Sequence, residues 1–150
     1  MSYLANYRKR VGLNTSSTKD KITLQMQRDF ENNVNDSLSG VEVFVTRPNE
    51  VSITEDSDKI KCLINDITFN DKRALDEKKL LVNVNENIDV GCYVLFDNCY
   101  WLIIFKEHKV TKAYKRFVIR RCNQIFNYKY KGEVYNIPVS IENLTIKYVA

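Results

Sequence analysis

The side chains best suited to covalent chemistry are one histidine and four cysteines, and their placement does not favour catalysis. A serine or cysteine nucleophile needs a neighbouring base, most often an imidazole. His108 is the only histidine and stands between Glu107 and Lys109 in a polar, lysine-rich stretch. Such a stretch predicts a loop rather than a reactive cleft. We therefore expect that the protein is not an enzyme.

The spacing of the cysteines also fails to predict a metal site. They occupy positions 62, 92, 99 and 122 and nowhere form a Cys-x-x-Cys pair, whereas structural zinc sites are built from closely spaced Cys and His ligands. Free cysteines usually pack as small core residues. The four glycines stand singly at positions 12, 40, 91 and 132, so no phosphate-cradling loop can be built from them. We expect no metal and no cofactor.

Two acidic clusters could supply paired carboxylates. The first contains Glu55, Asp56 and Asp58, and the second contains Asp76 and Glu77. Both lie in stretches that look exposed, where burial would not raise a carboxyl pKa enough for acid catalysis. We interpret them as solvated loops.

Positive charge is concentrated in one segment, between residues 106 and 131. This segment contains nine basic residues and one acidic residue, Glu107, so its net charge is +8. Because the net charge of the whole chain is +4, the other residues sum to −4. Such polarisation favours an anionic neighbour, either nucleic acid or an acidic protein surface, although a solvated rim of strand ends explains it equally well. The nine are Lys106, Lys109, Lys112, Lys115, Arg116, Arg120, Arg121, Lys129 and Lys131.

Length and composition indicate one globular domain. A chain of 150 residues with 44% hydrophobic and 28% charged residues can bury a core without metal or disulfide support. No apolar run approaches the roughly 20 residues of a membrane span. The first 13 residues are basic but lack the apolar region of a secretory signal. We expect a protein of the cytosol, or of a particle assembled there.

The stretch from Asp89 to Tyr128 predicts a β-meander around which the chain is organised. Apolar runs at 92–96 and 100–105 flank Asp97-Asn98, a pair that tolerates the positive φ of a tight hairpin turn. Residues 116–122 predict a third strand. Trp101 could serve as a stacking platform for bases, but in the run WLIIF we favour a core position.

The remaining elements predict a mainly β barrel or sandwich with an N-terminal helix and long charged loops. Residues 1–18 form an arm, and 19–150 form a single β-rich domain whose helix spans about 19–37. Apolar residues recur every fourth position along that helix and predict a face packed on the sheet. Further strands are expected at 41–45, 51–53, 60–69, 80–84, 125–130, 133–139 and 141–149, and a charged loop at 70–79. The apolar residues of the helix stripe are Ile22, Met26, Phe30, Val34 and Leu38.

The order of these motifs resembles the head-completion, or head-to-tail connector, proteins of tailed phages of Gram-positive bacteria. A helix and an apolar strand are followed by KCLINDITFNDKRALDEKKLLV, IDVGCYVLFDNCYWLII, YKRFVIRRCNQIFNY and GEVYNIPVSIENLT. The resemblance covers roughly residues 20 to 145. It is best at 76–79, at Gly91 and Trp101, and at 121–123. The chain departs from the pattern in its lysine-rich loop at 106–115 and in lacking an obvious second domain, which leaves open whether it is the adaptor-side, stopper or tail-proximal ring.

This resemblance implies a virion protein of the phage neck. Its members form a ring, of twelve copies, between the portal or adaptor protein and the tail, and they help to close the DNA-filled head. Ring subunits need two complementary, nonidentical faces. We hypothesise that Lys109, Lys112 and Lys115 face the packaged DNA in the lumen. Contacts between subunits or rings are then expected at Arg116, Arg120, Arg121, Glu55, Asp56, Asp58, Asp76 and Glu77.

A second hypothesis is a single-stranded nucleic-acid-binding β-barrel. It predicts steeply salt-dependent binding by the free chain.

Overall fold

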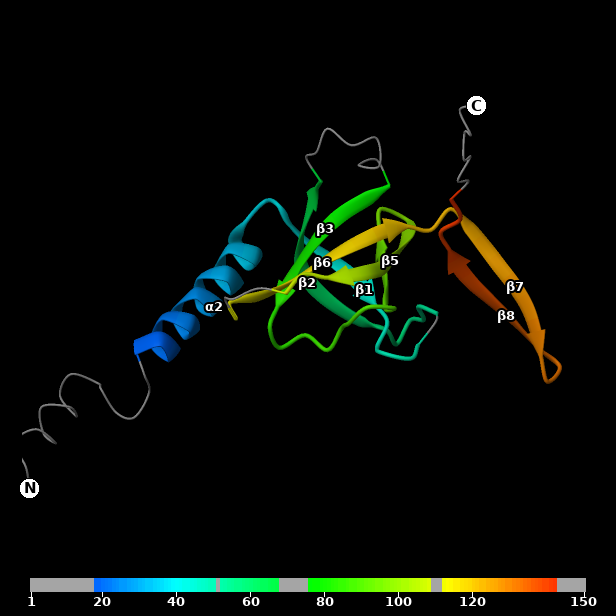
Figure 1. Cartoon of the computed structure of the whole chain (residues 1–150), viewed down its shortest axis with the longest axis horizontal. Helices are drawn as coiled ribbons and strands as arrows, with labels where there is room; N and C mark the ends of the chain where they lie inside the picture. The colour runs from blue at the N-terminus through cyan, green and yellow to red at the C-terminus, as the bar shows by residue number, and fades with distance from the viewer. Residues whose placement is uncertain (1–17, 51, 68–75, 109–111, 143–150) are drawn as a thin grey trace, which may run out of the picture.

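The computed structural model describes residues 18–50, 52–67, 76–108 and 112–142 of the chain. One helix is followed by eight strands (Figure 1). The helix is α2 (Thr18–Asp36), and the strands are β1 (Gly40–Val45), β2 (Asp58–Asp66), β3 (Glu77–Asn83), β4 (Tyr93–Phe96), β5 (Cys99–Lys106), β6 (Tyr114–Arg121), β7 (Gln124–Tyr130) and β8 (Glu133–Val139).

The first six strands form a closed antiparallel barrel in the order β1-β2-β3-β6-β5-β4. The barrel closes where β1 pairs with β4, with Phe44 opposite Leu95 and Val45 opposite Val94. The prediction of a mainly β fold with an N-terminal helix is therefore confirmed, and the structure selects a barrel.

Alternation along the strands fills the barrel interior. Successive side chains of a strand point to opposite faces, and β1, β2 and β6 each bury two residues that are two positions apart. Trp101 is 4% exposed, which confirms its predicted core position. The core consists of Val43, Val45, Ile60, Cys62, Leu80, Val82, Ile88, Cys92, Val94, Trp101, Ile103, Phe117 and Ile119.

The predicted meander is confirmed as β4, β5 and β6. Asp97 and Asn98 both have positive φ, 52° and 56°, so this pair makes the tight turn between β4 and β5. β5 pairs with β4 along one edge and with β6 along the other. The register of the β5–β6 pairing shifts between Ile103 and Phe105.

The strand predicted at 51–53 is wrong. β1 pairs with β2 instead, and Ile53 lies in a polar loop, while residue 51 is outside the described residues. Local hydrogen bonds satisfy the backbone of this loop: the Arg47 N–H donates to Glu50 Oε2 at 2.9 Å and the Thr54 N–H donates to Ser57 Oγ at 2.8 Å. Backbone N–H groups that donate to side chains of the same loop do not need a neighbouring β-strand as acceptor.

The helix packs on the barrel over only part of its length, contrary to the predicted stripe. Val34 is buried and Phe30 is half-buried, but Ile22 is 56% exposed and Leu38, beyond the end of the helix, is fully exposed. The reason is geometric: four residues advance a helix by roughly 40° more than one turn. A stripe with a spacing of four therefore winds around the helix and leaves the barrel.

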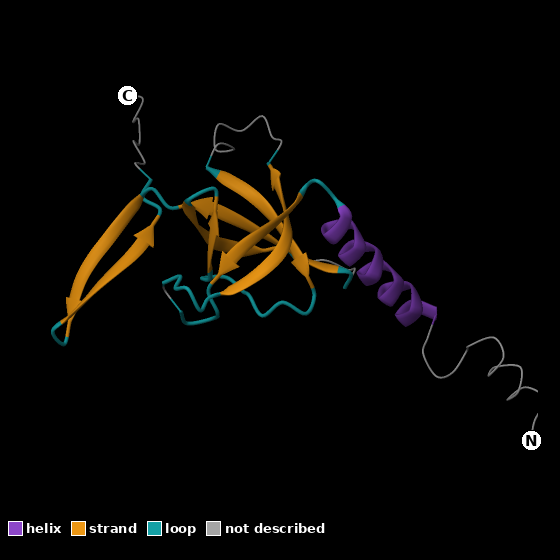
Figure 2. Ribbon diagram, turned by 180° about the vertical axis from the view of Figure 1, so that it is seen from behind, coloured by secondary structure: helices purple, strands orange, loops and turns teal. Residues whose placement is uncertain are grey.

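β7 and β8 form a separate two-stranded sheet that projects from the barrel (Figure 2). Their predicted turn is confirmed, with φ of 49° at Lys131 and 88° at Gly132. The hairpin is tethered at its base, where the Tyr93 hydroxyl donates to the Pro138 carbonyl oxygen at 2.8 Å. Asn123 reinforces the base, because its side chain exchanges two hydrogen bonds with the backbone of Ile141.

Several element boundaries differ from the predictions. α2 begins and ends one residue early, and 77–79 belong to β3 rather than to a charged loop. Residues 70–75, the arm at 1–17 and most of the strand predicted at 141–149 lie outside the described residues, and 141–142 are not in a strand. The division into an arm and one domain stays a prediction. No described helix has the length and apolar character required to cross a membrane.

Gly40 is the first residue of β1, and its backbone packs closely against the last turn of α2. A Cβ at this position would lie 2.1 Å from the backbone oxygen of Val34. We expect Gly40→Ala to lower the free energy of unfolding by about 1–3 kcal/mol, because the backbone must shift to relieve the overlap. Chemical denaturation measures this change, with Ser39→Ala as the neighbouring control. Equal stability of the two variants would contradict the close approach.

Candidate assembly surfaces

The arginines predicted to contact neighbouring subunits have acidic partners within the chain. Arg116 pairs with Glu107 at 3.1 Å, and Arg121 pairs with Asp76 at 3.2 Å. Arg120 lies between Glu77 and Glu142, the second at 3.2 Å. The structure thus brings the second acidic cluster, at the start of β3, together with Arg120 and Arg121 on the neighbouring strand β6, whereas Arg116 pairs with Glu107. These pairs account for the charges within one chain, and the contacts between subunits stay a prediction.

The first acidic cluster lies elsewhere, on the loop between β1 and β2 and at the first residue of β2, Asp58. Glu55 and Asp56 are exposed there. Asp58 accepts a hydrogen bond from Arg47 Nε at 2.8 Å, and this bond holds the pKa of the Asp58 carboxyl below its usual range. The structure does not bring this cluster near the arginines of β6 as one site within the chain, and its contact role also stays a prediction.

The predicted lumen lysines divide into three cases. Lys109 lies outside the described residues. Lys112 is exposed, and its backbone oxygen accepts a hydrogen bond from Gln27 Nε2 at 2.7 Å. Lys115 donates from Nζ to the Glu86 backbone oxygen at 2.7 Å. Lys112 and Lys115 therefore lie on the side of the barrel that carries α2.

The candidate nucleophiles are poorly placed for reaction. His108 is exposed at the end of β5, and all four cysteines are free. Burial raises the pKa of the Cys62 thiol to about 12 and that of Cys122 to about 11, so both stay protonated near neutral pH. Within the described ranges, no group of three or more His, Cys, Asp or Glu residues could hold a metal ion.

Among the described residues, the largest group of exposed apolar side chains lies on the β7–β8 hairpin. The sequence predicted these two strands but not their exposure. Every residue of β7 is exposed. Phe126 is 57% exposed and Val134 is 65% exposed. We call this region the hairpin surface and define it by Ile125, Phe126, Tyr128, Tyr130 and Val134.

Aromatic rings line one face of the hairpin. The ring centroids of Phe126 and Tyr128 are 6.2 Å apart, and those of Tyr128 and Tyr135 are 5.1 Å apart, both in stacked geometry. Lys131 Nζ lies 5.2 Å from the centroid of the Tyr130 ring at the tip. The hairpin thus presents stacked rings beside positive charge.

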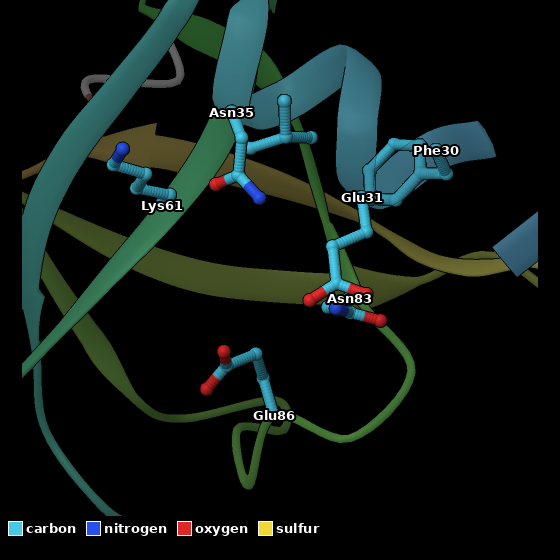
Figure 3. A pocket seen from close by; sticks show the side chains of 7 residues that line it. Phe30, Glu31, Asn35, Lys61, Asn83 and Glu86 are labelled. Atoms are coloured by element: carbon cyan, nitrogen blue, oxygen red, sulfur yellow. The ribbon is translucent and has the colours of Figure 1, made fainter. Parts of the chain in front are cut away.

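A cavity of about 190 Å³ opens beneath the C-terminal half of α2. Figure 3 shows the Glu31 side chain from α2 beside Asn83 and the Glu86 side chain across the gap, with the Lys61 ammonium directed away from Glu86. Burial raises the pKa of the Glu86 carboxyl, and the nearby charge of Asp58 adds to this effect. We call this the helix-side cavity; it is lined by Phe30, Glu31, Val34, Asn35, Lys61, Asn83 and Glu86.

Comparison with known proteins identifies the family. A model of the YomX N-terminal domain matches residues 8–121. The chain belongs to this family. The family is phage-associated. No curated protein and no solved structure matches the chain. The family match ends at Arg121, the last residue of β6, so it covers α2 and the barrel and leaves the β7–β8 hairpin outside.

Tyr93 is the residue that couples the barrel to the hairpin. We expect Tyr93→Phe to lower the free energy of unfolding by about 0.5–1.5 kcal/mol, since its buried hydroxyl then no longer donates to Pro138. Amide hydrogen exchange should become faster in β7 and β8 while barrel amides change less. Tyr100→Phe on β5 is the matched control. Unchanged exchange in the hairpin would show that the bond does not hold it.

Proposed function

We propose that this phage-associated protein is a structural subunit of the phage neck. In this role, copies of the chain form a ring, of twelve subunits, that joins the portal or adaptor protein to the tail and helps to close the DNA-filled head. Two findings support the proposal: membership of the YomX N-terminal domain family, and the resemblance of the motif order to head-completion proteins. The role is one of contact between proteins rather than bond making.

The observation that carries the proposal is the presence of two unlike exposed regions on opposite sides of one barrel. α2 extends from one side of the barrel, and its Ile22, Leu24 and Met26 side chains are exposed. The hairpin surface lies on the opposite side (Figures 1 and 2). Exposed apolar groups of this extent mark sites of contact with other molecules. A subunit with two nonidentical contact faces assembles head to tail, and such contacts form a ring when the rotation from one copy to the next closes after a whole number of copies.

Packaged DNA is the second partner in this proposal. Phosphate groups are neutralised by lysine without base reading. The lysine-rich segment supplies Lys109 and Lys112 for this purpose. Lys115 is the third predicted lumen residue, but its ammonium also bonds to the Glu86 backbone, so its substitution would affect the barrel as well.

The proposal is tested in phage particles. We expect an antibody against the chain to label the head–tail junction, and Lys109→Glu/Lys112→Glu to reduce the fraction of DNA-filled heads, because acidic side chains repel the phosphates. Electron microscopy and encapsidated DNA measure both effects, with Lys59→Glu on the exposed face of β2 as the control. Particles that lack the chain would refute the neck role, and normal filling of the lysine variant would refute the lumen role alone.

A second candidate function, single-stranded nucleic-acid binding, is favoured by the stacked rings of the hairpin. Base stacking on aromatic side chains beside lysines is typical of such binders. Trp101, buried in the barrel, does not provide this platform; Tyr128 and Tyr130 would. This function predicts that the free chain binds labelled single-stranded DNA, that affinity falls steeply between low and physiological salt, and that Tyr128→Ala/Tyr130→Ala weakens binding. Absence of binding at low salt would exclude it.

A further inference from the structure

The hairpin surface has exposed apolar side chains on both faces of the two-stranded sheet. A partner that packed against one face would leave those of the other face exposed. Side chains alternate between the faces of a strand. Phe126 and Tyr128 lie on one face, and Ile125, 62% exposed, lies on the other. A two-stranded hairpin is at best marginally stable alone in water. We therefore expect the hairpin to be enclosed when the protein is in its working state.

The barrel itself offers no strand edge to which a hairpin could add. Its six described strands are each paired on both sides, because the sheet closes between β1 and β4. A hairpin that docks onto the barrel of another copy therefore does so through side-chain contacts, for which a recess in the receiving surface is suited, rather than by strand pairing. The helix-side cavity is such a recess.

The size of the cavity fits a protein side chain. At about 190 Å³ it is smaller than the roughly 300–1,000 Å³ of sites that hold drug-sized ligands. An aromatic or lysine side chain, such as Tyr130 or Lys131 at the hairpin tip, is of suitable length and chemistry. The cavity is also bordered by apolar surface, since Leu24, 53% exposed, lies two helical turns before Glu31 on the same side of α2.

The charges of the two surfaces are complementary. The hairpin tip carries Lys129 and Lys131, and the cavity presents Glu31 and Glu86 with Lys61 turned away from Glu86. Lys115 already places one positive charge near Glu86, but burial and Asp58 outweigh it and raise the pKa of the Glu86 carboxyl. A further cation entering the cavity would favour the charged form of Glu86. Glu133, beside the tip, supplies a negative charge that complements the positive charge of Arg28, which follows Leu24 by one helical turn on α2.

From this complementarity we infer that the β7–β8 hairpin of one copy docks, tip first, in the helix-side cavity of the next copy. The inference rests on the proposed function and specifies the contact by which the ring would form. The hairpin and α2 lie on opposite sides of the barrel (Figures 1 and 2), so the two halves of this contact belong to different surfaces of each subunit. Every copy then donates one hairpin and receives another, as head-to-tail closure requires.

Charge exchange between the two surfaces tests the contact. The hairpin variant is Lys129→Glu/Lys131→Glu, and the cavity variant is Glu31→Lys/Glu86→Gln. Each alone should weaken self-association of the full chain at least about tenfold, because like charges then meet. An equimolar mixture of the two variants should associate again, since each now complements the other. Analytical ultracentrifugation measures association, and thermal unfolding verifies that each variant is folded.

The control variant is Asp66→Lys, which makes the same acid-to-lysine change as Glu31→Lys at the exposed end of β2, outside both α2 and the hairpin surface, and should leave association unchanged. Loss of association in the hairpin variant alone would show that the hairpin binds elsewhere, for example to another hairpin, and would overturn the inference. Normal association of both variants would overturn it as well, while leaving a ring of different contacts possible. A wild-type chain that is monomeric at all concentrations and absent from particles would overturn the proposed function itself.

Discussion

Closure of the barrel between β1 and β4 is the constraint on which the rest of the structure depends. The two strands share only two register pairs, Phe44 with Leu95 and Val45 with Val94. Thr46 extends the seam: its N–H donates to the Tyr93 carbonyl oxygen at 3.0 Å, and its hydroxyl oxygen accepts from the Tyr93 N–H at 2.8 Å. Thr46 is fully buried, and buried polar groups stabilise a fold only when they are paired in this way.

Closure also determines where the protein can interact. Once both edges of the sheet are joined, the barrel cannot recruit another strand. Elements outside the barrel, α2 and the β7–β8 hairpin, carry most of the exposed large apolar side chains of the described residues instead. Tyr93 links these two consequences, because its backbone completes the seam and its hydroxyl holds the hairpin through Pro138. Barrel stability and hairpin placement are thus coupled through one residue.

The charge distribution along the sequence indicates contact with another molecule, but several charged residues of β3 and β6 form ion pairs within the chain. A basic segment next to an acidic one can contact another molecule or itself. In the structure Arg120 is partly buried beside Glu77 and Glu142, and Arg121 lies beside Asp76. Partly buried ion pairs hold the register of neighbouring strands and reduce the charge available to partners. Lys112, Lys129 and Lys131 are exposed and keep their charge available.

The sequence by itself determined the local elements and much of the core. Alternation identified the strands at Val43 and Phe117, and a continuous apolar run identified the strand at Trp101. The turn-forming pairs Asp97-Asn98 and Lys131-Gly132 located two hairpins, because residue pattern and turn chemistry are local properties. Tertiary structure decided three things that depend on distant residues. These were the pairing of β1 with β2 rather than with 51–53, the departure of the α2 stripe from the barrel, and the exposure of the β7–β8 hairpin. An amphipathic strand has the same sequence pattern whether its apolar face meets its own core or another molecule, so only the position of the barrel showed that this face lies outside.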